Sequence, residues 1–73
     1  MYKLQLRSAA DRTMPILSDH FAPAIPTVGA KVAIRRKRDM VKRTNYRVTE
    51  VEFVLCEDDP GLDEVNVYLT PAD

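Results

Sequence analysis

The segment Asn45–Cys56, NYRVTEVEFVLC, carries the pattern that decides the fold. Its β-branched and aromatic residues alternate with polar ones, as in a strand with one buried face. The phase of this alternation changes after Val48, because the next apolar residues on the expected core side are Val51, Phe53 and Leu55. A strand can keep both sets on one face only if an extra residue is inserted. We therefore expect a β-bulge or sharp bend near Thr49-Glu50, with the later apolar set, Phe53 included, in the core.

Three other segments, residues 2–7, 31–35 and 64–70, alternate with period two and are predicted strands. Residues 16–21 could add a brief extended piece, and the proline-rich stretch 22–30 is expected to be a surface connection. Four or five short strands, one of them kinked, predict a mainly β fold. The alternatives are a small SH3-like barrel and a strongly bent antiparallel sheet, each with at most a short helical turn.

Two shorter patterns predict local turns. Asp59-Pro60-Gly61-Leu62 suits a type II turn, with proline at its second position and glycine at its third. Ser8–Asp11 has a weak helix-start pattern, and Pro15 would keep any helix there short.

The length of the chain bounds both its organisation and its stability. Residues 1–73 are expected to form a single domain, because 73 residues leave no room for a second one. In so small a core the free energy gained by burial is close to the entropy cost of ordering the chain, and a binding partner could add to its stability. Cys56 is the only cysteine, so no intrachain disulfide can form, and we expect a buried thiol. Without a signal-peptide core or a long apolar run, the expected location is cytoplasmic, with no membrane association.

The net charge of zero hides a strong asymmetry along the chain. All eleven lysines and arginines lie between Lys3 and Arg47, where the net charge is +8. From Val48 onward there are eight acidic residues and no basic one, a net charge of −8. Either the halves fold together with interleaved surface charges, or the molecule carries two oppositely charged patches.

Residues 35–43 form the most basic segment, with six basic residues in nine, and are expected to be a long hairpin loop. Such a loop could simply be solvated, or it could neutralise phosphates of a nucleic acid without reading its sequence. The candidate phosphate contacts are Arg35, Arg36, Lys37, Arg38, Lys42 and Arg43. Met40 and Val41 interrupt the charges, and they either anchor the loop or contact a protein partner.

Residues 50–64 contain seven acidic residues and no basic one. The cluster at residues 57–64 is too short for a calcium loop and lacks the required ligand spacing. A solvated polar face explains most such strips, but this one could also oppose a basic groove on another protein. The residues chosen as candidate contacts are Glu50, Glu52, Asp58 and Asp59.

Catalytic signatures are weak. Ser18-Asp19-His20 contains the letters of a triad, but adjacent residues in an extended chain point in different directions. A Cys56–His20 dyad is less expected than a buried structural cysteine. With two glycines and one histidine in the chain, we expect no catalytic residues, no metal and no cofactor.

Two functional hypotheses remain. The first is a non-enzymatic protein-binding module, potentially homo-oligomeric, in which the opposed charges orient a partner of unknown identity. Its candidate contacts are the Met40-Val41 pair and the four acidic residues named above. An accessory or inhibitor protein of a phage or mobile element would fit this size. The alternative is a nucleic-acid-binding module that uses the basic segment for non-specific phosphate contacts.

Overall fold

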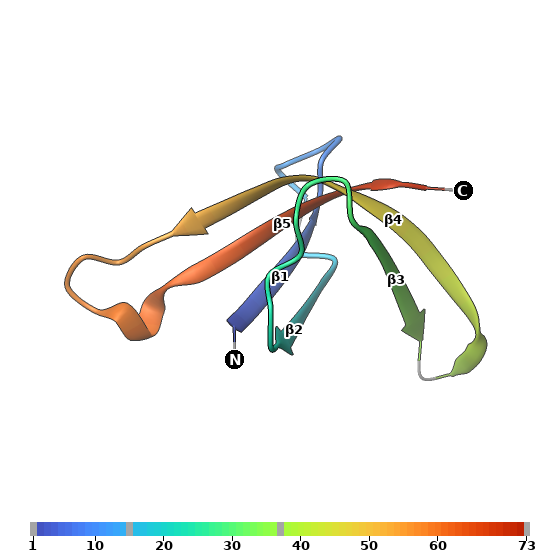
Figure 1. Ribbon diagram of the computed structural model, residues 1–73, viewed down its shortest axis with the longest axis horizontal. Coiled ribbons are helices and arrows are strands. Elements are labelled where there is room, and N and C mark those ends of the chain that lie inside the picture. The colour runs from blue at the N-terminus through green and yellow to red at the C-terminus, as the bar shows by residue number, and fades with distance from the viewer. Residues whose placement is uncertain (1, 15, 37, 73) are drawn as a thin grey trace.

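A computed structural model describes residues 2–14, 16–36 and 38–72, with the side chains of all of these except Arg36, Asp39, Met40, Val41 and Leu62. Five strands form one sheet that curls into a half-barrel (Figure 1). They are β1 (Tyr2–Ser8), β2 (Ser18–Ala22), β3 (Lys31–Arg36), β4 (Asp39–Val54) and β5 (Glu64–Pro71). A single turn of 3-10 helix, η1 (Pro60–Leu62), is the only helical element in the described part. The predicted mainly β fold is confirmed.

The strand order is β2-β1-β5-β4-β3, so β2 and β3 are the two edges of the sheet. Strand β1 pairs with β2 in antiparallel fashion, and β4 does so with both β3 and β5. The first and last strands, β1 and β5, lie side by side at the centre and run parallel. The bent antiparallel sheet, one of the two architectures expected from the sequence, thus includes one parallel pair, whose strands are joined through three intervening strands rather than by a hairpin.

The kink in β4 lies where the sequence pattern placed it. The register against β5 shifts between Val48 and Glu50, so Thr49 is the extra residue. The Thr49 hydroxyl donates a hydrogen bond of 3.2 Å to the backbone oxygen of Tyr68. Beyond the shift, Val51 is the register partner of Val67, so apolar residues on both sides of the bulge face the same side of the sheet. The predicted bulge is confirmed.

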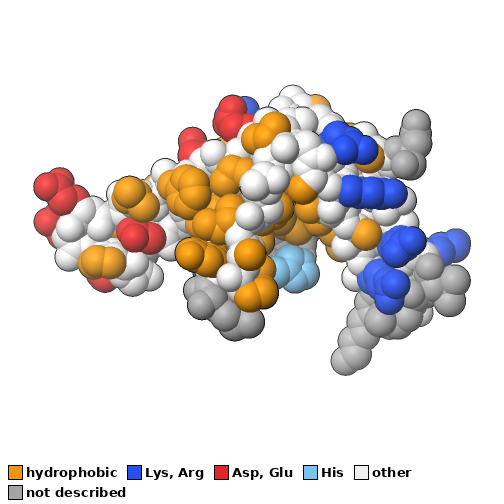
Figure 2. Space-filling view, in the orientation of Figure 1, with side chains coloured by type: hydrophobic (Ala, Val, Ile, Leu, Met, Phe, Trp, Pro, Cys, Tyr) orange, Lys and Arg blue, Asp and Glu red, His pale blue; other side chains and the backbone are white. Residues whose placement is uncertain are grey.

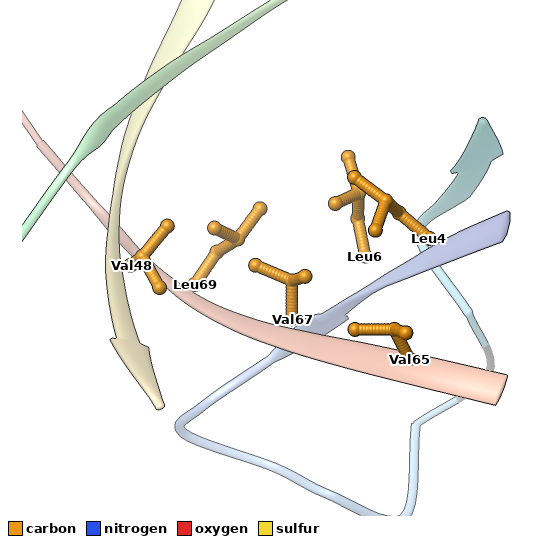
Figure 3. Packing of buried hydrophobic residues seen from close by; sticks show 6 residues of the cluster. All are labelled: Leu4, Leu6, Val48, Val65, Val67 and Leu69. Carbon is orange, nitrogen blue, oxygen red and sulfur yellow. The ribbon is translucent and has the colours of Figure 1, made fainter. Parts of the chain in front are cut away.

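The core occupies the concave face of the half-barrel, along the two central strands (Figure 3). Its fully or nearly buried members are Leu4, Leu6, Val48, Val65, Val67 and Leu69. Residues of the 23–30 connection and of β3, among them Ile25, Val32 and Ile34, pack against this cluster. Strands β1 and β5 contribute five of these six residues, and β4 contributes Val48.

Phe53 and Leu55 have the predicted parity but are not buried. Phe53 is 56% exposed and Leu55 is 73% exposed, so the prediction that they belong to the core is wrong. The physical reason is a lack of cover. Val51 packs against the core cluster, as does Ile25 of the connection that crosses the concave face in Figure 1, whereas the apolar side chains further along β4 remain open.

The local turns also differ from the predictions. Residues 59–62 form the 3-10 turn, in which the Asp59 carboxylate accepts a 3.0 Å hydrogen bond from the Gly61 N–H. A type II turn needs a positive φ at its third position, and in the described part only Gly29 has one, so that prediction is wrong. No helix forms at Ser8–Asp11, although the Asp11 N–H donates to the Ser8 hydroxyl at 3.4 Å.

Candidate binding surface

Large apolar side chains remain exposed next to the core. Tyr2, Phe53 and Leu55 line a hollow of about 360 Å³ at the end where β4 and β5 meet their connection. A neighbouring hollow of about 330 Å³ lies between β4 and the 23–30 connection, with Val28 and Phe53 in its wall. Since Phe53 belongs to both, Tyr2, Val28, Phe53 and Leu55 form one continuous surface, hereafter the concave apolar surface.

The half-barrel does not close. A third hollow, of about 210 Å³, is lined by β1 and β2 residues on one side and by β3 residues on the other. Leu4, Leu6, Val32 and Ile34 make its apolar wall, and His20 lies at its edge. The two edge strands therefore face each other across an open apolar seam rather than pairing.

The two signs of charge lie at opposite ends of the molecule. Figure 2 shows acidic side chains at the β4–β5 connection, basic side chains over the β3–β4 hairpin and apolar side chains between them. The ends are separated along an axis of 42 Å, whereas the other two dimensions are 24 and 21 Å. Arg12 and Glu50 form an ion pair of 2.7 Å that joins the two halves of the sequence. The visible face otherwise shows separated charge patches rather than interleaved ones.

The basic segment 35–43 is strand more than loop, so the prediction of a long loop is wrong. Arg35 pairs with Arg43, and Arg36 pairs with Asp39, which leaves a tight turn at the tip. The pairing is irregular between Arg35 and Arg36, where the register shifts. Of the other predicted phosphate contacts, Arg38 and Lys42 are exposed, whereas Lys37 and the Arg36 side chain lie outside the described residues.

Within this hairpin, like charges lie directly opposite each other. Lys31 pairs with Arg47, and Arg35 with Arg43, so four exposed cations share the convex face of the two strands. Such pairs destabilise a sheet, so they do not serve the fold. The Arg47 guanidinium donates a 2.7 Å hydrogen bond to the Gly29 carbonyl. The patch can attract phosphates or carboxylates.

The structure does not bring the predicted protein-binding residues together. Met40 and Val41 lie in β4 near the basic tip, with side chains outside the described part of the chain. Asp58 and Asp59 lie in the acidic β4–β5 connection at the other end. The acidic pair near the middle, Glu50 and Glu52, faces the convex side.

Both of these glutamates have partners within the chain. The guanidinium of Arg12 donates to Glu50 and lowers the pKa of that carboxyl. Glu52 accepts hydrogen bonds from the Asn66 amide at 2.9 Å and from the Tyr68 hydroxyl at 3.3 Å. They therefore organise the convex face rather than offering it to a partner.

The convex face is closed by polar contacts. The Arg12 guanidinium stacks 4.1 Å from the centre of the Tyr68 ring, and Tyr68 is buried. Arg7 donates to the side-chain oxygen of Asn66 at 2.9 Å. Of the large exposed apolar side chains near the acidic end, Phe53 and Leu55 lie on the concave side and Val54 on the convex side, so the continuous exposed apolar surface is the concave one.

The residues with chemical potential do not assemble a recognisable catalytic site. The Ser18 hydroxyl lies 2.5 Å from His20 Nε2, because residues two apart on β2 share a face, whereas Asp19 lies on the opposite face. No carboxylate of the described residues hydrogen-bonds His20. Cys56 is half-buried, less than predicted, and its N–H donates to the Asp63 carboxylate at 2.8 Å.

Among the described residues, no group of three or more histidine, cysteine or acidic side chains could hold a metal ion, and no helix is long and apolar enough to span a bilayer. Comparison of the chain with protein-family models, curated proteins and solved structures gave no match. The functional conclusion therefore depends on the surface itself.

Sequence reasoning missed the concave apolar surface. The alternation in the sequence predicts the face of the strand on which Phe53 and Leu55 lie, but it does not predict whether other residues cover that face. One signal was available: few residues outside the strands are apolar enough to cover so long a strand. Only the three-dimensional arrangement shows that Tyr2 and Val28, from distant parts of the sequence, join the same surface.

Proposed function

We propose that the protein is a non-enzymatic protein-binding module that docks a partner on the concave apolar surface. The observation that supports this most directly is the exposure of Phe53 and Leu55, at 56% and 73%, on the face that also carries the core. Contiguous exposed apolar side chains rimmed by polar residues are typical of interaction sites. Aromatic residues are also enriched in the buried centres of interfaces.

The charged ends would orient the partner. A basic hairpin and an acidic connection flank the apolar surface on opposite sides (Figure 2). Complementary charges raise association rates and reject wrongly oriented partners more than they add affinity. This arrangement retains the role proposed for the charge split, but it moves the centre of binding from the glutamates of the convex face to the concave apolar surface.

Affinity capture from the source cells tests this proposal with a matched pair of variants. Phe53→Asp places a charge on the concave apolar surface, whereas Val54→Asp places the same charge on the next residue, which is 42% exposed and faces the convex side. Phe53→Asp should lose the captured partner, and Val54→Asp should retain it. Equal capture by both variants would show that binding does not use the concave face.

A second candidate function, non-specific nucleic-acid binding, is supported by the two like-charged pairs of the β3–β4 hairpin. For a phosphate binder, log affinity falls with log salt by about 0.7 to 0.9 for each phosphate neutralised. The double variant Arg35→Gln/Arg43→Gln should then flatten the salt dependence of binding to random DNA or RNA by roughly 1.4 to 1.8. An unchanged slope would remove this hairpin as a phosphate site.

A further inference from the structure

We propose that the partner on the concave apolar surface is a second copy of this chain, related by a two-fold axis perpendicular to the long axis. This inference rests on the proposed docking function and names its occupant. In such a dimer the two concave faces meet, and the acidic end of each copy lies against the basic end of the other.

Charge complementarity favours this occupant. The chain is neutral overall, with +8 in its first 47 residues and −8 in the remainder. A partner with a single sign of charge would be attracted by one end and repelled by the other. A second copy in antiparallel orientation matches both ends at once, because a two-fold interface brings the same surface of each copy together.

The exposed area has the size that a dimer requires. Area scaling gives roughly 4,600 Å² for a compact monomer of 8.3 kDa. The chain exposes 5619 Å², about 1,000 Å² more than this scaling predicts. A stable interface buries about 800 Å² on each partner. The surplus on one copy is therefore sufficient for one face of a standard interface.

The open seam gives the same indication. Leu4, Leu6, Val32 and Ile34 line a hollow between the two edges of the half-barrel, and Phe53 and Leu55 extend the apolar region toward the acidic end. Two half-barrels packed face to face would cover both regions and complete a core that one copy builds only in part. A small chain with a thin core gains stability from such association.

Charge reversal at each end provides the test. Arg38→Glu/Lys42→Glu would lower the net charge of residues 35–43 from +5 to +1, and Glu57→Lys/Asp58→Lys would change that of residues 57–64 from −5 to −1. Lys42 is chosen because the neighbouring Arg43 faces the convex side. Glu57 and Asp58 suit this purpose because, unlike Asp59 and Asp63, they make no hydrogen bond within the described part of the chain. All four side chains are exposed, so the fold should persist, which far-UV circular dichroism would verify.

Sedimentation equilibrium should give wild-type protein a mass of about twice 8.3 kDa, with dimerisation weakening as salt rises. Each double variant alone should dimerise about a hundredfold more weakly, because at both ends of the dimer one of the two facing surfaces would be nearly neutral. Mixed in equal amounts, the two variants should form a dimer containing one copy of each, which native mass spectrometry would identify.

The inference is overturned if wild-type protein has the mass of one chain at all concentrations, or if the mixed variants remain monomeric. If Phe53→Asp still abolishes capture of another protein in that case, the docking surface stands and only the second copy is excluded. If Phe53→Asp and Val54→Asp behave alike in both capture and self-association, the proposed function fails as well.

Discussion

Replacing Leu69 with alanine should remove a large share of the stability of this chain. Leu69 is 1% exposed and packs in the cluster with Val48 and Val67 (Figure 3). The substitution removes three carbons, each contributing about 0.8 kcal/mol to burial, and leaves a cavity that raises the total cost to about 3–4 kcal/mol. A domain of 73 residues has roughly 4–11 kcal/mol of stability in all.

Phe53→Ala is the matched comparison, since it removes a larger apolar side chain from the same face of the sheet. A fully buried phenylalanine costs about 3–5 kcal/mol when truncated. Because Phe53 is more than half exposed, we expect about 1–2 kcal/mol. Urea denaturation followed by far-UV circular dichroism would measure both, at concentrations low enough to keep the chain monomeric. A cost for Phe53→Ala equal to or above that for Leu69→Ala would refute the reasoning, because it would place Phe53 inside the core of one chain.

Three further predictions follow from individual contacts. Deleting Thr49 removes the bulge, so the apolar side chains on one side of it must turn to the convex face. Cooperative unfolding in urea should then be lost. A preserved cooperative transition would show that the fold does not need the bulge. The pKa of Glu50 is lowered from its usual 4.5, chiefly by the hydrogen bond from Arg12, so its contribution to stability is present above that pH and disappears as the pH falls through the lowered value. As the pH is lowered, the free energy of unfolding should therefore fall less in Arg12→Gln than in the wild type. An identical fall in both proteins would show that the Arg12–Glu50 ion pair does not contribute to stability. Half-buried Cys56 should react with iodoacetamide more slowly in the folded chain than in urea, and equal rates would place the thiol at the open surface.

The fold was predictable where the pattern is local. The phase change in the apolar residues around Thr49 required a bulge, because the side-chain period of a strand is two. The parallel pairing of β1 with β5 depends on contacts between residues more than fifty positions apart, and no local pattern encodes it. The exposure of Phe53 was not predictable for the same reason, since it depends on how far the 23–30 connection extends over β4.

The candidate site was predictable only in outline. The segregation of charge in the sequence became a segregation in space, because the β3–β4 hairpin and the β4–β5 connection lie at opposite ends of one long strand. Glu50 and Glu52 were plausible contacts by composition alone, but Arg12 and Asn66 engage them within the chain. Side-chain partners that come from distant segments decide which charges remain available, and a sequence does not display them.

Hydroxyl-radical footprinting, compared between dilute protein and protein saturated with its partner or with itself, tests the docking role of the concave face most directly. It reports the solvent access of individual side chains without changing any of them. Phe53 and Leu55 should become protected on association, while Val54, between them in sequence and on the opposite face, should react as before. Unchanged reactivity of Phe53 and Leu55, with protection confined to Val54 or to the basic hairpin, would contradict the assignment of this surface.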